Sequence, residues 1–320
     1  MSMKYAMEAY EMLDSPSVSG ESVKSALVGA GVKERDITVK TVRGPKGHTD
    51  FVKVWIPGAK GKRSGGVAPT LGIVGRLGGI GARPERIGLV SDGDGAVSAI
   101  ATAMKLGRMA SIGDSLEGDV FVSTHVCPNA PTRPHDPVPF MDSPIDMMIA
   151  NGEEMSDELD AVLSIDTTRG NRVINHKGFA ISATVKEGYI LRVSEDLLSL
   201  MTSVTGKLPV VLPITMQDIT PYGNDVYHLN SILQPCTATK APVVGVALTS
   251  ESAVPGCATG ASHIVDIELA VRFVVEVAKY FGEGKAKFFN EKDFSRLVEL
   301  YGPMTHLQTM GKNGKQPQKL

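Results

Sequence analysis

Short apolar strands alternate with amphipathic helices along most of this chain, and this alternation constrains its fold more than any other feature. Strands are predicted at 69–74, 120–124, 161–165, 210–214 and 242–247, and helices at 96–106, 195–204, 225–233 and 266–280. Such alternation is typical of a parallel sheet covered by helices. We therefore predict an α/β fold with three αβα layers, in which a mixed, mostly parallel sheet is flanked by helices.

The ends of the chain add three expectations. Before the main strands, helices are predicted at 5–13 and from Ser19 or Ser22 to Ala30, followed by strands at 36–42 and 50–56. The 320 residues can bury one large core. We predict a single domain over 1–301 without a separate lid, and a partly disordered tail over 302–320, where the last ten residues are polar and basic.

Composition narrows the class of partner. The 33 basic and 35 acidic residues nearly cancel and are not clustered in a basic face, which argues against a nucleic-acid partner. No apolar run is long enough for a membrane span, and the first ten residues lack a signal-peptide core. Three cysteines without a CxxC pair argue against a disulfide framework. We expect a cytoplasmic protein that binds a small molecule or peptide.

Two carboxylates follow one of the predicted strands. Asp92 and Asp94 lie in the small-residue turn Ser-Asp-Gly-Asp-Gly-Ala-Val that opens the helix at 96. Such a turn lies at the carboxyl edge of an α/β sheet, where these folds hold their ligands. Helix capping explains one acceptor, but not two. We predict that Asp92 lines a pocket, with Asp94 a weaker candidate for the same role.

Other polar residues end neighbouring strands. Asp166 ends the strand at 161–165, where a buried carboxylate is costly unless it is paired or binds a metal. His125 and Cys127 end the strand at 120–124 and could face the same pocket, as soft metal ligands or as ordinary core residues. Asp225, in a Gly-Asn-Asp turn, and His263, just before the last strong helix, are further candidates at this edge.

Three further segments could be functional. We do not favour a functional role for the first two, and we leave the role of the third open. The Gly-rich loop 75–81 lacks the spacing of a dinucleotide fingerprint. The pair His48 and Asp50 has the spacing of a zinc motif, but it falls in a predicted β-hairpin turn. The Pro-rich segment 128–144 could cover the pocket as a lid or contact a neighbouring subunit.

Taken in order, several segments resemble the co-catalytic zinc aminopeptidases, a clan of single-domain exopeptidases. The turn at 91–97 resembles the segment that holds the metal-bridging aspartate, and 164–167 resembles the strand end with a terminal metal aspartate. The other similar segments are 13–21, 118–124, 223–225 and 242–266. The resemblance covers residues 5–281 and implies a zinc-exopeptidase-like (phosphorylase/hydrolase-like) fold. It also suggests a narrower, uncharacterised prokaryotic family of that fold.

The departures from this resemblance bear directly on the chemistry. Arg76-Leu77-Gly78 stands where the clan has its first His-x-Asp, and Cys127-Pro128 stands near the place of its two glutamates. Gly256-Cys257-Ala258 stands where the clan has a late histidine, with His263 several residues further on. Most ligands of a two-zinc centre and its general base are therefore missing. Of the clan's metal ligands, only Asp92 and Asp166 remain.

Two functions follow from this comparison. The first is a hydrolase of a small peptide, amide or modified amino acid, whose rebuilt pocket could hold one divalent metal such as zinc and in which Arg76 could bind a substrate carboxylate. The second is a catalytically inactive small-ligand-binding or regulatory protein, in which Arg76 pairs with Asp92 or Asp166 and replaces the metal. A nucleotide-dependent enzyme is a third and weaker hypothesis. We also expect a homo-oligomer, because sheets of this class often pair.

Overall fold

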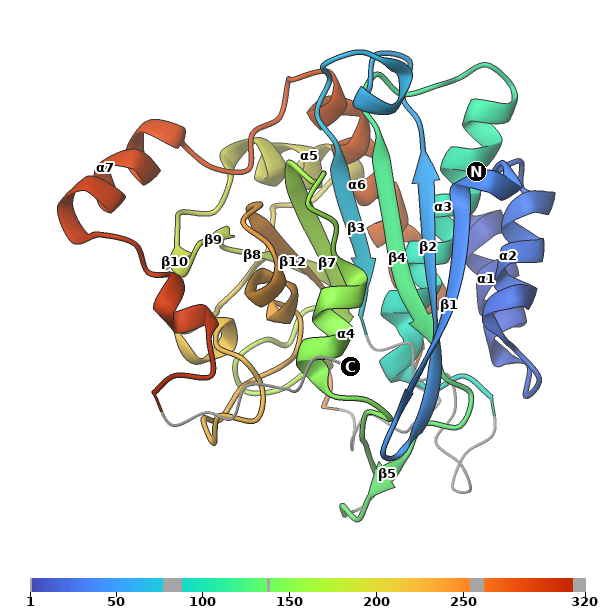
Figure 1. The fold of residues 1–320 in the computed structure, drawn as a ribbon, viewed down its shortest axis with the longest axis horizontal. Coiled ribbons are helices and arrows are strands. Elements are labelled where there is room, and N and C mark those ends of the chain that lie inside the picture. Colours follow the sequence, from blue (N-terminus) through green and yellow to red (C-terminus); the bar gives the residue numbers. More distant parts are fainter. Residues whose placement is uncertain (1, 77–87, 137–138, 254–261, 313–320) are drawn as a thin grey trace.

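The computed structural model describes residues 2–76, 88–136, 139–253 and 262–312. Its main strands are β1 (Ile37–Gly44), β2 (Gly47–Ile56), β3 (Leu71–Gly75), β4 (Val120–Val126), β7 (Ala161–Thr167), β8 (Gly178–Ser182), β11 (Val211–Leu212) and β12 (Val243–Thr249). Within the described residues they form the sheet β1-β2-β4-β3-β7-β12-β8-β11, with β9 (Val185–Lys186) and β10 (Tyr189–Ile190) attached beside β12. Figure 1 shows this sheet through the middle of the molecule.

The central strands of the sheet are parallel. β3 pairs in parallel with β4 and β7, β7 with β12, and β8 with β11, whereas β1–β2, β2–β4 and β8–β12 are antiparallel. The predicted α/β fold with a mixed, mostly parallel sheet is therefore confirmed. The carboxyl ends of β3, β4, β7 and β12 meet at one edge, and the antiparallel β2 begins at that same edge.

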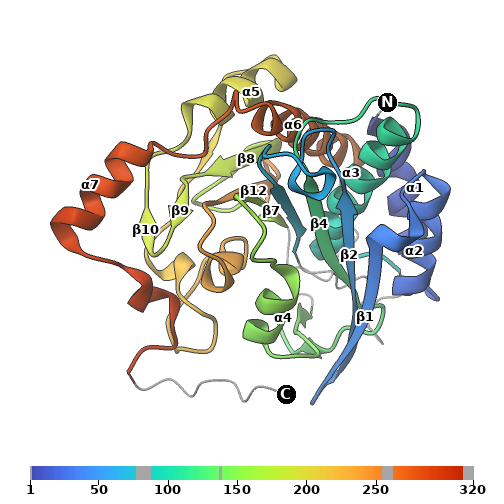
Figure 2. The same cartoon turned by 45° about the horizontal axis from the view of Figure 1, so that its top comes forward.

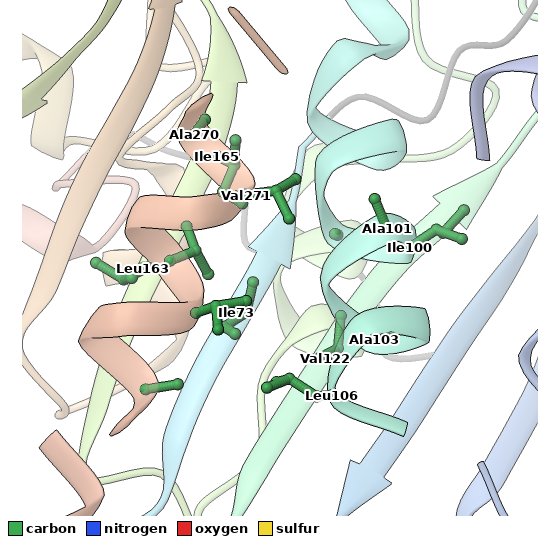
Figure 3. Close-up of a cluster of buried hydrophobic side chains, with 14 of the residues drawn as sticks. Ile73, Ile100, Ala101, Ala103, Leu106, Val122, Leu163, Ile165, Ala270 and Val271 are labelled. Atoms are coloured by element: carbon green, nitrogen blue, oxygen red, sulfur yellow. The ribbon is translucent and has the colours of Figure 1, made fainter. Parts of the chain in front are cut away.

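One face of the sheet is covered by five helices. These are α1 (Ser2–Asp14), α2 (Gly20–Gly29), α3 (Asp94–Ser111), α5 (Glu195–Thr205) and α6 (Ile264–Gly282). Ile73, Val122 and Leu163 project from adjacent strands toward the layer that contains α3 and α6, as Figure 3 shows. Each fully buried aliphatic side chain of this kind contributes about 1.5–3 kcal/mol relative to an exposed one. This layer therefore carries most of the apolar core.

Short helices and irregular segments cover the opposite face. They include α4 (Met147–Glu154) and the 3-10 helices η4 (Gln217–Ile219) and η5 (Gln234–Ala238). The two 3-10 helices pack over Val74, Phe121 and Val162, and α4 packs against Phe51 of β2. In Figure 2, α4 lies on the other side of the strands from α3 and α6. The prediction of a helix at 225–233 is wrong. Asp225 has a φ of 63°, in the left-handed region, and the Leu229 and Ile232 amides donate to the side chains of Asp218 and Asn230 instead of to helical carbonyls.

The helices near the two ends differ in how well the sequence predicted them. The capping box at Ser19 begins α2 as expected, and the β1–β2 hairpin forms. Helix α7 (Glu291–Tyr301), capped by Asn290, was not predicted. The tail bends back over the body, where the Gln308 amide in η6 (Thr305–Gln308) donates to the Cys236 carbonyl at 2.6 Å. Residues 313–320, the rest of the predicted tail, lie outside the described residues.

None of the helices in the described ranges combines the length and apolar character that a bilayer span requires.

Candidate functional site

Three polar side chains project from the carboxyl edge toward the face covered by α4. Successive side chains of a strand point to opposite faces. Ile73, Val122 and Leu163 face the helical layer. Three residues further along the chain from each of them, a side chain therefore faces the other way. These residues are Arg76, His125 and Asp166. Their contacts agree, since they reach α4, the start of β2 and the segment after η4 respectively.

Arg76 is buried in an ion pair with Glu154. The guanidinium is 1% exposed and the carboxylate 0%, and Nη1 of Arg76 donates to Oε2 of Glu154. Nη1 also donates to Asn151 Oδ1 at 3.0 Å, and Nη2 contacts the Met147 sulfur at 3.1 Å. The expectation that Arg76 pairs with Asp92 or Asp166 is therefore wrong. Its partner comes from α4, which places Glu154 and Asn151 one helical turn apart on the same face.

Asp166 is buried in β7, and its two oxygens are hydrogen-bonded. Ser231 donates its hydroxyl to Oδ2 at 2.6 Å, and the Thr167 amide donates to Oδ1 at 2.7 Å. Burial raises the pKa of Asp166, while these two hydrogen bonds and the nearby charge of Arg76 oppose the rise. The side chain is therefore a fixed acceptor at the centre of the edge.

Asp92 lies in the 3-10 turn η3 (Ser91–Gly93), which is tied to β7 by the Thr167 hydroxyl at 2.9 Å from the Ser91 carbonyl. The side chain of Asp92 is half-buried. Burial raises its pKa well above the ordinary range, and the charges of Asp166 and Asp94 add to the rise. Asp92 and Asp166 therefore act on each other electrostatically at this edge.

Tyr222 belongs to the same cluster. Its ring stacks on His228 with centroids 4.5 Å apart, and its amide donates to the Gln234 side chain at 3.1 Å. Burial raises the pKa of the Tyr222 phenol, and the charges of Asp166 and Asp92 are among the further causes. The phenol therefore stays protonated at neutral pH and is a hydrogen-bond donor near both carboxylates.

Asp94 begins α3 and pairs with a second arginine. Its carboxylate accepts from Nη2 of Arg169 and from the Ser262 hydroxyl, and the residue has no exposed surface. Burial raises the pKa of Asp94 to about 7, although Arg169 and Ser262 oppose the rise. Gly95, the next residue, allows this close packing, because a Cβ there would lie 2.5 Å from the Ile165 carbonyl oxygen.

His125 and Cys127 face the edge but have structural partners. Nδ1 of His125 lies 2.8 Å from the Thr49 hydroxyl, and its ring stacks on Phe51. Burial and the positive charge of Arg76 lower the pKa of His125 to about 3, so the imidazole is neutral. Cys127 is buried near the His48 carbonyl, and burial raises the pKa of its thiol to about 11. Neither side chain has the exposure or charge of a nucleophile.

The remaining candidates do not join this cluster. Asp225 is exposed at the left-handed position of its turn, and His263 is exposed before α6. Cys257 and the Gly-rich loop after Arg76 lie outside the described residues. His48 is the second residue of β2, and Asp50 accepts from the Gly20 amide at 2.9 Å, so this carboxylate holds the start of α2.

The segment 128–144 packs beside η3. Its described part forms the hairpin β5 (Thr132–Arg133) and β6 (Phe140–Met141), seen at the bottom of Figure 1. Met141 is buried in a small cluster with Val90, Cys127 and Ala130, and Val90 directly precedes η3. The hairpin is therefore anchored next to Asp92.

Sequence reasoning missed Glu154, Asn151, Ser231, Tyr222 and Arg169. The signal available for Glu154 and Asn151 was a three-residue spacing of polar side chains on a short helix, and that helix was expected only near residue 156. Ser231 lies in the segment for which a helix was predicted wrongly. Arg169 follows Asp166 and Thr167 in the sequence, so its position just after a strand could have identified it as a candidate site residue.

The described residues do not fit a zinc ion. Over these ranges no group of three or more His, Cys, Asp and Glu side chains is arranged to hold a metal. Both oxygens of Asp166 accept hydrogen bonds, and Nδ1 of His125 contacts Thr49. Zinc in proteins takes about four ligands. We therefore derive no chemical step through a metal.

Comparison with known proteins places the chain in a family. No curated protein matches it. A family model described as "Protein of unknown function (DUF1177)" matches residues 40–311, which span the whole sheet from within β1 onward together with α3, α4 and α6. The chain therefore belongs to the DUF1177 family of proteins of unknown function.

Proposed function

We propose that this chain is a hydrolase of a small peptide, amide or modified amino acid, and that it is a divergent member of the zinc aminopeptidase-like fold with a rebuilt site. The observation that carries the proposal is the pair Asp92 and Asp166. Asp92 is half-buried, and Asp166, whose charge acts on it, is fixed by Ser231 and Thr167. Neighbouring carboxylates whose pKa values are raised by burial are common at sites of general acid–base catalysis.

Asp92 is the catalytic residue in this proposal. Its raised pKa makes the ionised carboxylate a stronger base than an ordinary aspartate. The carboxylate takes a proton from water as the water oxygen bonds to the substrate carbonyl carbon. The same proton then passes to the leaving nitrogen as the carbon–nitrogen bond breaks. Asp166 is a positioning residue, since its charge raises the pKa of Asp92.

Tyr222 completes the proposed site as a hydrogen-bond donor. Because its phenol remains protonated near both carboxylates, it can donate to the carbonyl oxygen as negative charge develops there. Arg76 does not contact substrate in this proposal, since it is 1% exposed and occupied by Glu154 and Asn151. This revises the idea that Arg76 binds a substrate carboxylate.

The experiment is hydrolysis of a panel of dipeptides, amino-acid amides and N-acyl amino acids by the full chain. Asp92→Asn is expected to lower kcat by about 10²–10⁴-fold, the usual contribution of a general acid–base group. The control is Asp157→Asn, an exposed aspartate beyond α4, which should leave kcat unchanged. Elemental analysis of protein purified without chelator accompanies the assay. Turnover that is equal in both variants would overturn the role of Asp92.

A second candidate is a small-ligand-binding protein without catalysis, and the Arg76–Glu154 pair favours it. The buried guanidinium of Arg76 offsets the negative charge of Glu154 and Asp166, as a bound metal ion would. This candidate predicts that no member of the panel is hydrolysed and that the protein is metal-free. It also predicts that a ligand from the panel still raises the melting temperature of wild type.

The assembly and the location of the protein are also proposals. We propose a cytoplasmic homo-oligomer. Sedimentation of the full chain tests the assembly, and a monomer over the micromolar range would contradict it.

A further inference from the structure

Arg169 has hydrogen-bond donors that its known partner does not use. Its side chain is 8% exposed, and only Nη2 donates to Asp94. Within the described part of the chain, the Nε and Nη1 groups are buried and have no hydrogen-bond partner. The preceding residue Thr168 is also buried, and its hydroxyl has no partner among the described residues. Buried polar groups are nearly always satisfied, so these unsatisfied groups on consecutive residues indicate a missing acceptor.

These donors lie at the N-terminus of a long helix. Asp94, which contacts Arg169, is the first residue of α3, and among the residues that the structure describes no side chain caps the start of this 18-residue helix. The N-terminus of a helix carries a partial positive charge and is a common site for anions. The unsatisfied arginine donors and the uncapped helix are independent observations, and both favour a negatively charged acceptor.

The same place lies beside the proposed catalytic residue. Arg169 follows Asp166 by three positions in the sequence, and Asp92 lies two residues before Asp94. Thr167, between Asp166 and Thr168, ties the end of β7 to η3 through the Ser91 carbonyl. An acceptor that satisfied Arg169 would therefore be held on the chain segments that carry Asp92 and Asp166.

Asp94 does not saturate Arg169. One carboxylate uses one N–H of a guanidinium that has five. Burial keeps the pKa of Asp94 near 7, so its negative charge is only partly present at neutral pH. A planar guanidinium with N–H groups to spare suits the paired oxygens of a carboxylate.

We propose that Arg169 and Thr168, at the N-terminus of α3, form a subsite for a carboxylate group of the small-molecule substrate. The inference rests on the proposed function and narrows it. The substrate class becomes peptides or amides that carry a free carboxylate, such as N-acyl amino acids. Arg169 is a specificity-determining residue that holds the substrate, and Asp92 acts on its amide.

The test is calorimetric titration of the full chain with N-acetylglycine, which has the carboxylate, and with N-acetylglycinamide, which lacks it. Wild type is expected to bind N-acetylglycine and to bind the neutral amide at least tenfold more weakly. Arg169→Met should weaken N-acetylglycine binding at least tenfold, and Thr168→Val several-fold. Arg172→Met, which changes an exposed arginine of the same segment, is the matched control and should bind as wild type does.

Additional variants keep the test informative if Arg169→Met fails to fold. Arg169→Lys keeps the charge beside Asp94 but loses the planar donors, and Thr168→Val removes a hydroxyl that has no partner. Both should weaken N-acetylglycine binding while the melting temperature without ligand stays near that of wild type. Equal binding by wild type and these variants, or no preference for N-acetylglycine over the amide, would overturn the subsite. Inorganic phosphate bound more tightly than N-acetylglycine would also overturn it.

The subsite and the proposed hydrolase can fail separately. Binding of N-acetylglycine that depends on Arg169 and Thr168, without any turnover, supports the subsite and refutes the hydrolase. Turnover that depends on Asp92 but has the same KM for charged and neutral substrates in wild type and Arg169→Lys supports the hydrolase and refutes the subsite.

Discussion

Removing the charge of Arg76 should destabilise the protein strongly, and removing its partner as well should restore most of the loss. In Arg76→Met the Glu154 carboxylate stays at 0% exposure without its counter-charge, and Asn151 loses the donor to its side-chain oxygen. Breaking a buried ion pair by removing one member costs about 3–5 kcal/mol. The free energy of unfolding of an ordinary domain is about 5–15 kcal/mol, so this change removes a large share of it.

The double variant Arg76→Met with Glu154→Gln separates the cost of the unpaired charge from the loss of packing. Because the double variant buries no isolated charge, its free energy of unfolding should lie within about 1–2 kcal/mol of the wild-type value. The measurement is the free energy of unfolding in urea. Lys60→Met is the control, because it breaks the exposed pair with Glu117 and should cost less than about 1 kcal/mol.

The pH dependence gives a second readout of the same variant. Burial raises the pKa of Glu154 even with Arg76 present, and the loss of Arg76 raises it further. The protonated carboxyl is then favoured in the folded state, so the penalty of Arg76→Met should shrink as the pH falls. A penalty no larger than that of Lys60→Met, or a double variant less stable than Arg76→Met, would refute the reasoning.

Four further predictions follow, three on residues of the edge and one on a glycine of α2. The pKa of Asp94 rises on folding from 3.8 to about 7, so its folded state binds the proton more tightly and stability falls as the pH rises through this window. At 1.36 kcal/mol per pKa unit the loss is about 4 kcal/mol, and urea unfolding of Asp94→Asn should lack this slope. The pKa of His125 falls to about 3, so its stabilisation is lost as the pH drops from 6.5 toward 3. A His125 proton resonance that shifts between pH 5 and 8 would contradict this assignment. Gly95→Ala places a Cβ 2.5 Å from the Ile165 carbonyl oxygen and should cost about 1–3 kcal/mol in thermal unfolding. Gly29→Ala in α2, where a Cβ meets nothing within 4 Å, should instead stabilise by about 0.5–1 kcal/mol.

The sheet and its edge were largely predictable because their signals are local. Continuous apolar runs marked β3, β4, β7 and β12, and the carboxylates Asp92 and Asp166 stand next to such runs in the sequence. Parallel strands bring their carboxyl ends to one edge, so no tertiary information was needed to expect the two residues there. The pattern could not show that residues 225–233 form no helix, because the Leu229 amide donates to the side chain of Asp218, eleven positions earlier, instead of to a carbonyl of its own segment.

The partners of the charged residues could not be predicted in the same way. Glu154 lies 78 positions from Arg76, and Arg169 lies 75 positions from Asp94. Both pairs form only because folding brings these distant segments of the chain together. The eight-residue helix α4 has no strong periodic signal of its own, so its burial against Arg76 comes from tertiary packing.

Thr49 at the start of β2 and Ser231 after η4 complete opposite sides of the same edge, although 182 positions separate them along the chain. During synthesis, Asp166 would emerge well before the hydroxyl that holds one of its oxygens. A shortened chain ending before Ser231 would therefore contain every central strand but β12, yet it would leave this acid without its donor. Assembly of the edge is consequently a late and non-local step, of the kind that slows folding.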